Sequence, residues 1–392
     1  MKSCAIFLTT INSHQKNYCI NISNPLSLSD RFLNNTTMIV LTLDAGGSKF
    51  VFSAIKDGKF IGESKKIPSN GHDLDKCLLG MIDGFKQQQK AVGEPIDAIS
   101  FAFPGPANYR EGIIGNTENL KGFRGGVPLK AMLENIFKVP VFINNDGDLY
   151  TYGESLAGSL PLINAQLQKA GNKMQYSNVV GLTIGSGFGG GFVHDKVLIT
   201  GDNVTACEIW KMSNRLDPER NCEELIAIRS LRRLYAEYAK IPFDDTPMPR
   251  EIYLIGMGKE KGNKTAAKKA YFHMGECLGD AVANMITLFD GIVVIGGGVS
   301  GARELIIPGV EKELQHKFLS LSRVTQNIYC LNKPEQLAEF VKPESKTLKV
   351  PLSNKTVEYS YMPKCGYVFS SFDTSMMINI GAYHFAKEML KK

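Results

Sequence analysis

The chain has 392 residues, more than one hydrophobic core usually organises, so two domains are expected. Hydrophobic residues make up 43% and charged residues 21%, which is typical of a globular protein and excludes a disordered, collagen-like or coiled-coil chain. The net charge of +6 comes from 45 Lys and Arg against 39 Asp and Glu, without a basic block of the kind that follows a phosphate backbone. No apolar run approaches the roughly 20 residues that cross a bilayer. We therefore expect no nucleic-acid partner and no membrane span.

The cysteines and the N-terminus bear on location. Eight cysteines are scattered without a CxxC pair, which is typical of free thiols in a reducing compartment, so we expect a cytoplasmic protein. Residues 5–10 form too short an apolar stretch for an export signal. Because Met38 directly precedes a strand-like run, residues 1–37 are predicted to be a leader that is disordered or not translated.

The first part of the folded chain alternates strands and helices. Residues 39–44 and 49–55 are β-rich runs around the turn Ala-Gly-Gly-Ser, which predicts two antiparallel strands. Residues 74–90 have helical spacing, and residues 96–102 and 139–144 are short apolar strands.

The rest of the chain continues this alternation. The predicted elements are a helix to residue 158, a polar connection over 161–178, a strand over 179–184, an amphipathic helix over 222–240, a long helix over 265–289, a strand over 291–295, an irregular stretch over 319–369 and a helix over 375–392. Two glycine turns each follow a strand, which suggests two β-rich lobes with a nucleotide between them.

The first glycine turn follows a carboxylate at a strand end. Gly46 and Gly47 would let backbone N–H groups approach phosphate oxygens, Ser48 adds a hydroxyl, and Asp44 can hold Mg²⁺ through water. A plain hairpin turn with glycines at positive φ explains the same residues.

The second glycine turn is denser, since five of the nine residues 183–191 are glycine. Such a loop suits the other side of a phosphate clamp, although glycine-rich hairpins also occur for purely structural reasons. Together with the first turn, it favours the clamp.

Asn145 and Asp146 lie at the end of a predicted buried strand, where open α/β sheets place ligand groups. A carboxylate there can accept the proton of a sugar hydroxyl as the oxygen attacks a γ-phosphate. Asp146 is also suited to cap the helix that follows. Residue type alone does not separate these two roles.

Six motifs stand in a fixed order along the chain. They are Asp44-Ala-Gly-Gly-Ser-Lys49, Pro104-Gly-Pro106, Glu118-Asn-Leu120, Asn144-Asn-Asp146 with Gly153-Glu154 downstream, Gly185-Ser-Gly-Phe-Gly-Gly-Gly191 and Gly296-Gly-Gly-Val299. In this order they resemble the ROK family of sugar kinases and repressors, from about residue 38 to residue 392. The resemblance implies an α/β, two-lobed actin/hexokinase-like (ribonuclease H-like) fold with the active site in the interlobe cleft.

The resemblance also implies a division of the chain and a set of site residues. An N-terminal lobe with the phosphate-binding hairpin would cover 38–145, a C-terminal lobe with the second phosphate loop and the adenosine site 146–374, and a helix over 375–392 would pack back near the N-terminal lobe. The ATP phosphates are expected at Gly46, Gly47, Ser48, Lys49, Gly185, Ser186 and Gly187, the adenosine near Gly296 and Gly297, and Mg²⁺ at Asp44 through water. The sugar hydroxyls are expected at Asn119, Asn145 and Asp146, with Asp146 as the base.

One segment departs from the family. Kinases of this family carry Gly-Glu-x-Gly-His followed by Cys-x-Cys-Gly-x-x-Gly-Cys-x-Glu, whose His and three Cys bind a structural zinc. Here the His position holds Lys211, the first two Cys positions hold Arg215 and Asp217, and Cys222 is the one cysteine that remains. One thiolate cannot make a four-ligand site, so no structural zinc is expected.

Two acidic residues of that segment keep their places. By the resemblance, Glu208 and Glu224 are expected sugar ligands. Trp210, the only tryptophan, would either stack on a sugar ring or anchor the core or the hinge.

These observations predict an enzyme, an ATP:hexose phosphotransferase acting on glucose or a related sugar, in this family most often at the 6-hydroxyl. N-acetylglucosamine, mannose and fructose are alternative substrates, and a sugar-binding ROK protein without catalysis is an alternative class. A sugar-responsive repressor is a third class, but such members carry a helix-turn-helix of more than about 60 residues before the first glycine turn. Only 43 residues precede Asp44 here. The expected partners are the sugar and ATP, and a homodimer is expected.

Overall fold

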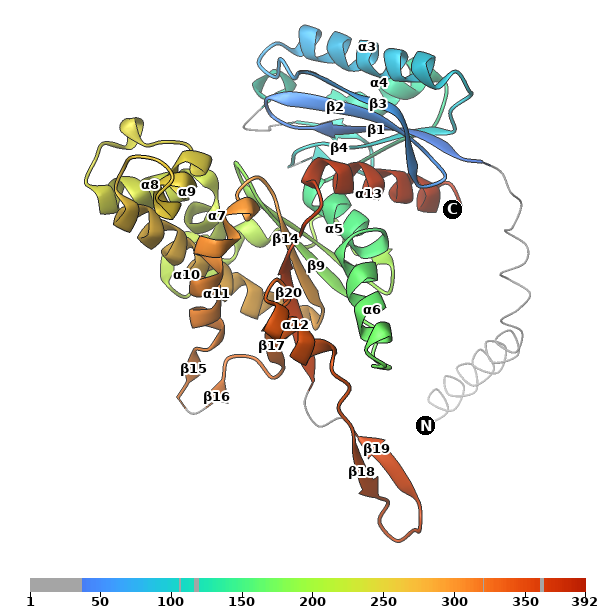
Figure 1. Ribbon diagram of the computed structural model, residues 1–392. Helices are drawn as coiled ribbons and strands as arrows, with labels where there is room; N and C mark the ends of the chain where they lie inside the picture. The colour runs from blue at the N-terminus through green and yellow to red at the C-terminus, as the bar shows by residue number, and fades with distance from the viewer. Residues whose placement is uncertain (1–36, 106, 116–119, 320, 360–362) are drawn as a thin grey trace, which may run out of the picture. The chain divides into compact units, whose positions relative to one another are not determined.

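The structure is a computed structural model that describes residues 37–105, 107–115, 120–319, 321–359 and 363–392. The chain divides into two units, Met1–Met38 and Ile39–Lys392, and the fold described below is that of the second (Figure 1). Residues 1–36 of the predicted leader lie outside the described residues.

The first lobe is built on a five-stranded sheet in the order β3-β2-β1-β4-β8. Its strands are β1 (Ile39–Ala45), β2 (Lys49–Lys56), β3 (Lys59–Pro68), β4 (Ala98–Ala102) and β8 (Val141–Asn144). β1 pairs antiparallel with β2 and parallel with β4, which pairs parallel with β8. The carboxyl ends of three strands therefore meet at one edge.

Helices cover both faces of this sheet (Figure 1). α3 (Leu74–Val92) and α4 (Leu129–Phe137) lie on one face, and the C-terminal helix α13 (Thr374–Met389) lies on the other, against β1 and β4. A small three-stranded sheet forms a rim, and its strands are β5 (Ala107–Asn108), β6 (Ile113–Ile114) and β7 (Val127–Pro128), with the 3₁₀ turn η1 (Lys121–Phe123) between β6 and β7.

The second lobe repeats this plan with a six-stranded sheet in the order β11-β10-β9-β14-β20-β17. Its strands are β9 (Val179–Ile184), β10 (Phe188–His194), β11 (Val197–Leu198), β14 (Ile292–Gly296), β17 (Asn327–Cys330) and β20 (Lys364–Phe369). The glycine-bearing hairpin β9–β10 is antiparallel, and β9, β14, β20 and β17 are parallel. In both sheets a hairpin thus leads into parallel strands.

The helices of the second lobe pack on this sheet and on one another. They are α5 (Asp146–Leu156), α6 (Ser159–Lys169), α7 (Cys222–Ile226), α8 (Ile228–Ala239), α9 (Pro249–Met257), α10 (Lys264–Phe289), α11 (Arg303–Leu314) and α12 (Pro334–Val341). The short elements are η2 (Ile209–Lys211), β12 (Ser213–Asn214), β13 (Asp217–Asn221), η3 (Phe243–Asp245), η4 (Ser300–Ala302), β15 (Lys317–Phe318), β16 (Leu321–Ser322), β18 (Lys346–Lys349) and β19 (Thr356–Tyr359). The β18–β19 hairpin extends away from the lobe (Figure 1).

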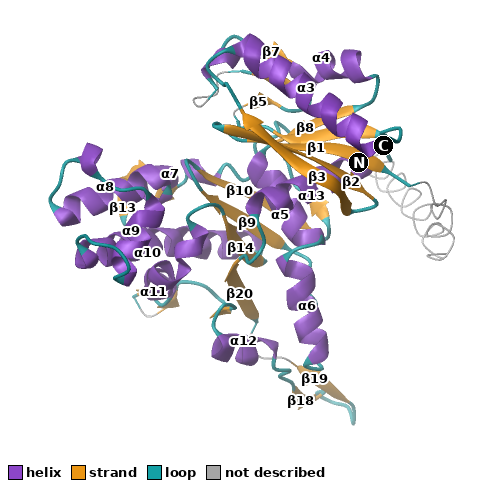
Figure 2. Cartoon of the chain, turned by 45° about the horizontal axis from the view of Figure 1, so that its top comes forward, coloured by secondary structure: helices purple, strands orange, loops and turns teal. Residues whose placement is uncertain are grey.

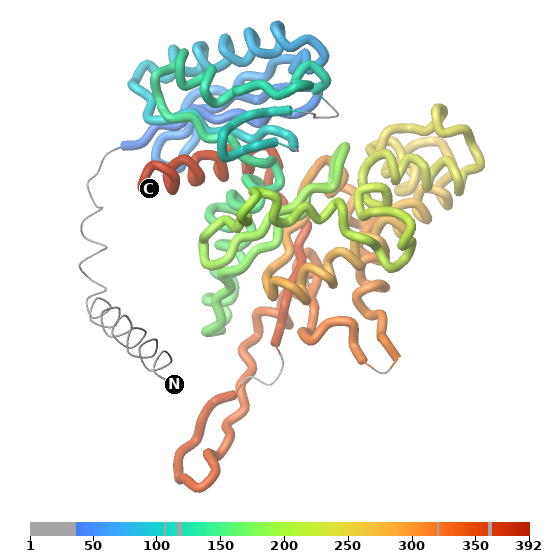
Figure 3. The backbone as a smooth tube through the Cα atoms, turned by 180° about the vertical axis from the view of Figure 1, so that it is seen from behind, coloured from blue at the N-terminus to red at the C-terminus, as the bar shows by residue number. Residues whose placement is uncertain are grey.

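Two helices join the lobes. Figure 2 shows α5 and α13 between the two sheets, and α13 runs from the second lobe back to the first (Figure 3). The helices touch at glycines, because a Cβ on Gly153 would overlap the carbonyl of Met377 and a Cβ on Gly381 would overlap that of Leu149.

Three stretches differ from the sequence-based expectation. The segment 161–178, predicted as a connection, contains most of α6, whose buried Leu160, Ile163 and Leu167 have helical spacing. The stretch 319–369, predicted as irregular, contains α12 and the parallel strands β17 and β20. The helix predicted over 222–240 is broken at Ala227. In the part of the chain that the structure describes, no helix is long and apolar enough to cross a membrane.

Candidate active site

Two carboxylates meet where the strands of the first sheet end. Asp44 on β1 pairs with Ala102 on β4, and Ala102 pairs with Asn144 on β8, so Asp44 and the segment after β8 share one sheet edge. Burial raises the pKa of Asp44. The negative charge of Asp44 in turn acts on Asp146.

Asp146 begins α5 but is not the residue that caps it. The Asn145 side chain occupies the N-cap, since its Oδ1 accepts from the Gly147 N–H at 2.8 Å. Burial and the charges of Asp44 and Glu208 raise the pKa of Asp146 to about 6, against the lowering effect of the backbone N–H of Gly147. A base with this pKa is ionised at neutral pH yet can still accept a proton.

The first glycine turn is tight, with the Gly46 N–H donating to the Lys49 carbonyl at 3.0 Å. The Ser69 hydroxyl donates to the Gly47 carbonyl at 2.6 Å. Neither glycine adopts a left-handed φ, so the backbone conformation does not require glycine at either place. Ser48 and Lys49 are exposed. The turn presents backbone without side chains beside Asp44.

The second glycine turn is fastened to the start of α7 and α8. The Gly185 N–H donates to the Gly187 carbonyl and the Ile228 N–H to the Gly185 carbonyl, both at 2.9 Å. The Phe188 N–H donates to Glu223 Oε2 at 3.0 Å. No described atom lies within 4 Å of where a Cβ on Gly185 would stand, and Ser186 is exposed. Open space therefore adjoins this turn.

Gly296 ends β14 and Gly297 follows it beside the same turn, since Gly296 pairs with Thr183 on β9. Packing and backbone conformation both require glycine at these two positions. A Cβ on Gly296 would overlap the Tyr150 side chain, and Gly297 is left-handed with a φ of 91°. The Thr374 hydroxyl accepts from the Gly297 N–H at 2.9 Å and so ties β14 to α13.

Glu208 reaches the start of α5 from the second lobe. Its carboxylate accepts from the Trp210 indole N–H, and the Lys211 ammonium lies 4.8 Å from the centre of the Trp210 ring. Cys207, just before it, has a φ of 60°, which few residues other than glycine adopt. Trp210 packs partly against the core of the second lobe, so it anchors Glu208.

Two residues of the cluster were missed by sequence reasoning. Asp148 lies in the first turn of α5 and is 4% exposed, and its Oδ1 has no hydrogen-bond partner among the described atoms. Burial, with the charges of Glu208 and Asp146, raises the pKa of Asp148 well above its ordinary value. Tyr109 is 6% exposed and bonds to Asn145. Only its place after Pro-Gly-Pro marks Tyr109 in the sequence, and only proximity to Asp146 marks Asp148.

Of the other two expected sugar ligands, one lies outside the described residues and one does not join the cluster. Asn119 lies outside the described residues. Glu224 is exposed at the start of α7, where its Oε2 accepts from the Asn221 N–H at 3.1 Å in a capping box. Its neighbour Glu223 is the residue that reaches the second glycine turn.

The segment that departs from the zinc motif is held by other contacts. Arg215 Nη2 donates to Glu313 Oε2 at 2.6 Å, and Cys222 is buried. Within the described ranges, no three His, Cys, Asp or Glu side chains are grouped so that they could hold a metal ion. The expectation of no zinc stays a prediction.

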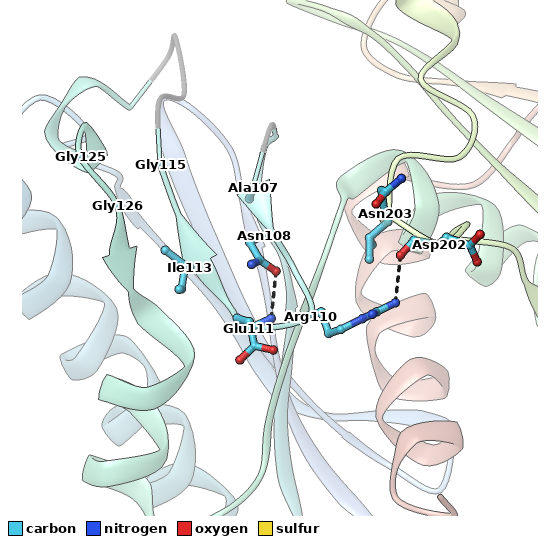
Figure 4. A pocket seen from close by; sticks show the side chains of 11 residues that line it. Ala107, Asn108, Arg110, Glu111, Ile113, Gly115, Gly125, Gly126, Asp202 and Asn203 are labelled. Carbon is cyan, nitrogen blue, oxygen red and sulfur yellow. Dashed lines mark hydrogen bonds between the residues drawn. The ribbon is translucent and has the colours of Figure 1, made fainter.

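A cavity of about 790 Å³ opens between the lobes, and its lining residues Asn108 and Arg110 flank Tyr109 in the chain (Figure 4). The rim of the first lobe lines one side, and residues 202–204 of the second lobe line the other. Arg110 Nη2 donates across it to the Asp202 carbonyl at 3.1 Å. Asp146 is not among the lining residues, so the cavity adjoins the carboxylate cluster rather than containing it.

Comparison with known proteins bears on what this arrangement is. The sequence profile of the ROK family matches residues 40–336. The chain belongs to the ROK family. Its fold is the actin/hexokinase-like fold of the solved ROK sugar kinases.

Three relatives of this ROK protein, each a sugar kinase, illustrate the similarity. A glucokinase structure from Parabacteroides distasonis is 43% identical, with a TM-score of 0.81, and the match covers 91% of this chain and 99% of that one. An N-acetylmannosamine kinase of Haemophilus influenzae is 27% identical over 71% of this chain and 86% of its own length. A Streptomyces griseus glucokinase solved with glucose and AMPPNP shares the fold, with 16% identity, a TM-score of 0.60 and coverage of 90% and 100%.

Proposed function

We propose that this ROK sugar kinase transfers the γ-phosphoryl group of ATP to a hydroxyl of a hexose, with Asp146 as the general base. The enzyme class, sugar phosphotransferase, is that of the relatives named above. The observation that carries the proposal is the place of the Asp146 carboxylate at the start of α5, close to the charges of Asp44 and Glu208, which with burial raise its pKa to about 6. Asn145, not Asp146, is the N-cap of this helix.

The proposed step needs little covalent chemistry from the protein. The Asp146 carboxylate takes the proton of the sugar hydroxyl, the hydroxyl oxygen bonds to the γ-phosphorus, and the β–γ bridging oxygen leaves with ADP. Because Asp44 and Glu208 disfavour the charged form of Asp146, accepting the proton relieves their mutual repulsion.

The two glycine turns would hold the ATP phosphates. Their glycines, at 46, 47, 185 and 187, are not left-handed, and a Cβ on Gly185 would stand in open space. Backbone without side chains can approach phosphate oxygens, and Lys49 adds a positive charge beside the first turn. Asp44 offers the carboxylate oxygen that Mg²⁺ prefers, and the ion would neutralise phosphate charge.

The proposed substrate is glucose, phosphorylated at the 6-hydroxyl, with N-acetylglucosamine, mannose and fructose as alternatives. The relatives named above act on glucose or on N-acetylated hexosamines, which supports a hexose without choosing one. The sugar-binding groups of this proposal are Asn145, Asp146 and Glu208, and the effect of the Glu208 charge on Asp146 supports grouping them.

A coupled ADP-release assay against a panel of hexoses and amino sugars tests the proposal. We expect one sugar to stimulate ADP release far above the rate without sugar, and EDTA to abolish the signal. If no sugar stimulates ADP release, the kinase assignment fails. If EDTA has no effect, the role given to Mg²⁺ fails instead.

A further inference from the structure

A short relay of hydrogen bonds runs from the first turn of α5 into the first lobe. Asn145 Nδ2 donates to the Tyr109 hydroxyl at 3.3 Å, and that hydroxyl donates to the Phe103 carbonyl at 2.9 Å. On its other side, Asn145 Oδ1 accepts from the Gly147 N–H at 2.8 Å. The relay therefore links the N-cap of α5 to the end of β4.

Backbone groups at both ends fix the direction of every bond. The Gly147 N–H can only donate, so the oxygen of the Asn145 amide must face it and the nitrogen must face Tyr109. The Phe103 carbonyl can only accept, so the Tyr109 hydroxyl donates its one hydrogen to that carbonyl and accepts from Asn145. A flipped Asn145 amide would set its nitrogen against the Gly147 N–H, which also donates to Asp146 Oδ1 at 3.0 Å, and its oxygen against a hydroxyl whose hydrogen already bonds to the Phe103 carbonyl.

The surroundings of Tyr109 keep its hydroxyl protonated and in place. Tyr109 is 6% exposed, and burial raises the pKa of its hydroxyl well above the ordinary value, so the hydroxyl keeps its hydrogen at any working pH. A Cβ on Gly105 would lie 2.9 Å from the Tyr109 oxygen and 3.5 Å from Asn145 Nδ2. The glycine of the Pro-Gly-Pro motif thus leaves room for the bond between Tyr109 and Asn145.

One hydrogen of the Asn145 amide remains for a ligand. Nδ2 carries two hydrogens, Tyr109 takes one, and the other has no partner among the described residues. We propose that Tyr109 is a positioning residue that fixes the Asn145 amide as a hydrogen-bond donor to a sugar oxygen. This inference rests on the proposed function of the site and adds to it a residue and a direction of bonding.

Affinity for sugar, measured by calorimetry, tests the inference apart from turnover. The probes are glucose, N-acetylglucosamine and N-acetylmannosamine, with the full chain. Tyr109→Phe removes the acceptor for Asn145 and should weaken sugar binding about five- to tenfold, the usual loss for one hydrogen bond. ATP affinity should stay unchanged.

Two further variants separate positioning from a general loss of packing. Tyr271 is also buried and donates to the Pro249 carbonyl at 2.7 Å in the core of the second lobe, so Tyr271→Phe loses a similar bond away from the site. Its sugar affinity should stay within about twofold of wild type, with a similar loss of stability. Asn145→Ser keeps a side chain that can cap α5 but removes the amide. In that background, Tyr109→Phe should have no additional effect.

The outcomes are distinct. Unchanged sugar affinity in Tyr109→Phe, an equal loss in Tyr271→Phe, or an additive loss in the Asn145→Ser background would each overturn the inference. A wild-type chain that binds sugar without transferring phosphate would overturn the proposed function, and the inference would still be judged on the affinities. If neither these three sugars nor mannose or fructose binds, both fail.

Discussion

The chemistry of Asp146 comes from residues that surround it rather than from its own place in the sequence. Burial raises its pKa first, and the charges of Asp44 and Glu208, one from each lobe, add to that effect. The neighbouring Asn145 is the N-cap of α5, and Asp146 Oδ1 shares the same Gly147 N–H at 3.0 Å. The result is a carboxylate poised near neutral pH, as a general base requires.

Replacing Asp146 with Asn tests this residue directly. The amide keeps the shape of the side chain but cannot accept the proton, so turnover should fall about a hundredfold or more. Calorimetry should show that the variant still binds sugar. A melting curve should show that the fold is intact. Wild-type turnover in this variant would show that another group is the base.

The pH dependence of activity follows from the same group. Because Asp146 has a pKa of about 6 and acts in its ionised form, kcat/KM should be level above that value. Below it, kcat/KM should fall about tenfold per pH unit as the carboxylate becomes protonated. A rate profile measured from pH 4.5 to 8 checks this. A profile that stays flat down to pH 5 would contradict the assignment.

Asp148 gives a prediction about stability. Its native pKa is raised well above the value of about 3.9 expected for an unfolded Asp, so in the range between the two the native state binds more protons. Stability therefore decreases as pH rises through that range, by about 1.4 kcal/mol per unit. Asp148→Asn removes this dependence, so the variant should melt higher than wild type at pH 8.

Thermal melts at pH 5 and pH 8 provide the measurement. The gap between Asp148→Asn and wild type should be larger at pH 8. Asp83, which is exposed on α3, offers a control for the substitution itself, and Asp83→Asn should not raise the melting temperature at pH 8. A gap for Asp148→Asn that does not change with pH would mean that this carboxyl is not protonated in the native state.

At the scale of elements, α5 is positioned by close contacts that admit only glycine. A Cβ on Gly147 would lie 2.7 Å from the Gly190 carbonyl of β10, and a Cβ on Gly153 would overlap the Met377 carbonyl of α13. These backbone contacts place the first turn of α5, with its carboxylates, between the two sheets. The glycine of the Gly-Glu pair after the Asn-Asn-Asp motif thus has a packing reason.

Gly153→Ala should therefore cost stability and activity together. The added methyl meets backbone, which cannot move aside, so α5 and α13 must separate at a cost of about 1–3 kcal/mol. Gly80 in α3 is the control, because a Cβ there meets only the Ile67 side chain, at 3.4 Å. Gly80→Ala should be neutral or stabilising by up to about 1 kcal/mol. Denaturant unfolding of both variants measures these changes in the free energy of unfolding. Equal free energies of unfolding for the two variants would contradict the packing argument.

At the scale of the whole described unit, the groups proposed to bind sugar come from both lobes. Asn145 and Asp146 follow the first sheet, and Glu208 belongs to the second lobe. One hydrogen bond, from Arg110 to the Asp202 carbonyl, already spans the adjoining cavity. Phosphoryl transfer must exclude water from ATP, so closure on sugar is expected.

Trp210 offers a direct measure of that closure. It is the only tryptophan and its indole N–H bonds to Glu208, so its emission should change saturably when the substrate sugar binds. A sugar that the assay shows is not phosphorylated should leave the emission unchanged. If emission and small-angle scattering both stay constant with a sugar that is phosphorylated, the closure, or Glu208 as a sugar ligand, must be abandoned.

The sequence by itself determined the strands around both glycine turns and the long helix α10, because these follow from periodicity and turn residues close together in the chain. It missed α6, whose apolar residues are diluted by polar ones, and the parallel strands β17 and β20, whose pairing is non-local. The order of six motifs sufficed to recognise the family.

Only the tertiary structure decided which groups act together at the site. The relay through Tyr109 and the bond of Glu223 to the second glycine turn depend on contacts between distant segments, and the cap at Asn145 appears only once α5 has formed. The raised pKa values of Asp146 and Asp148 depend on burial and on charges from both lobes. Local sequence carries residue type and spacing, whereas burial and hydrogen-bond direction exist only once the sheets and helices have packed.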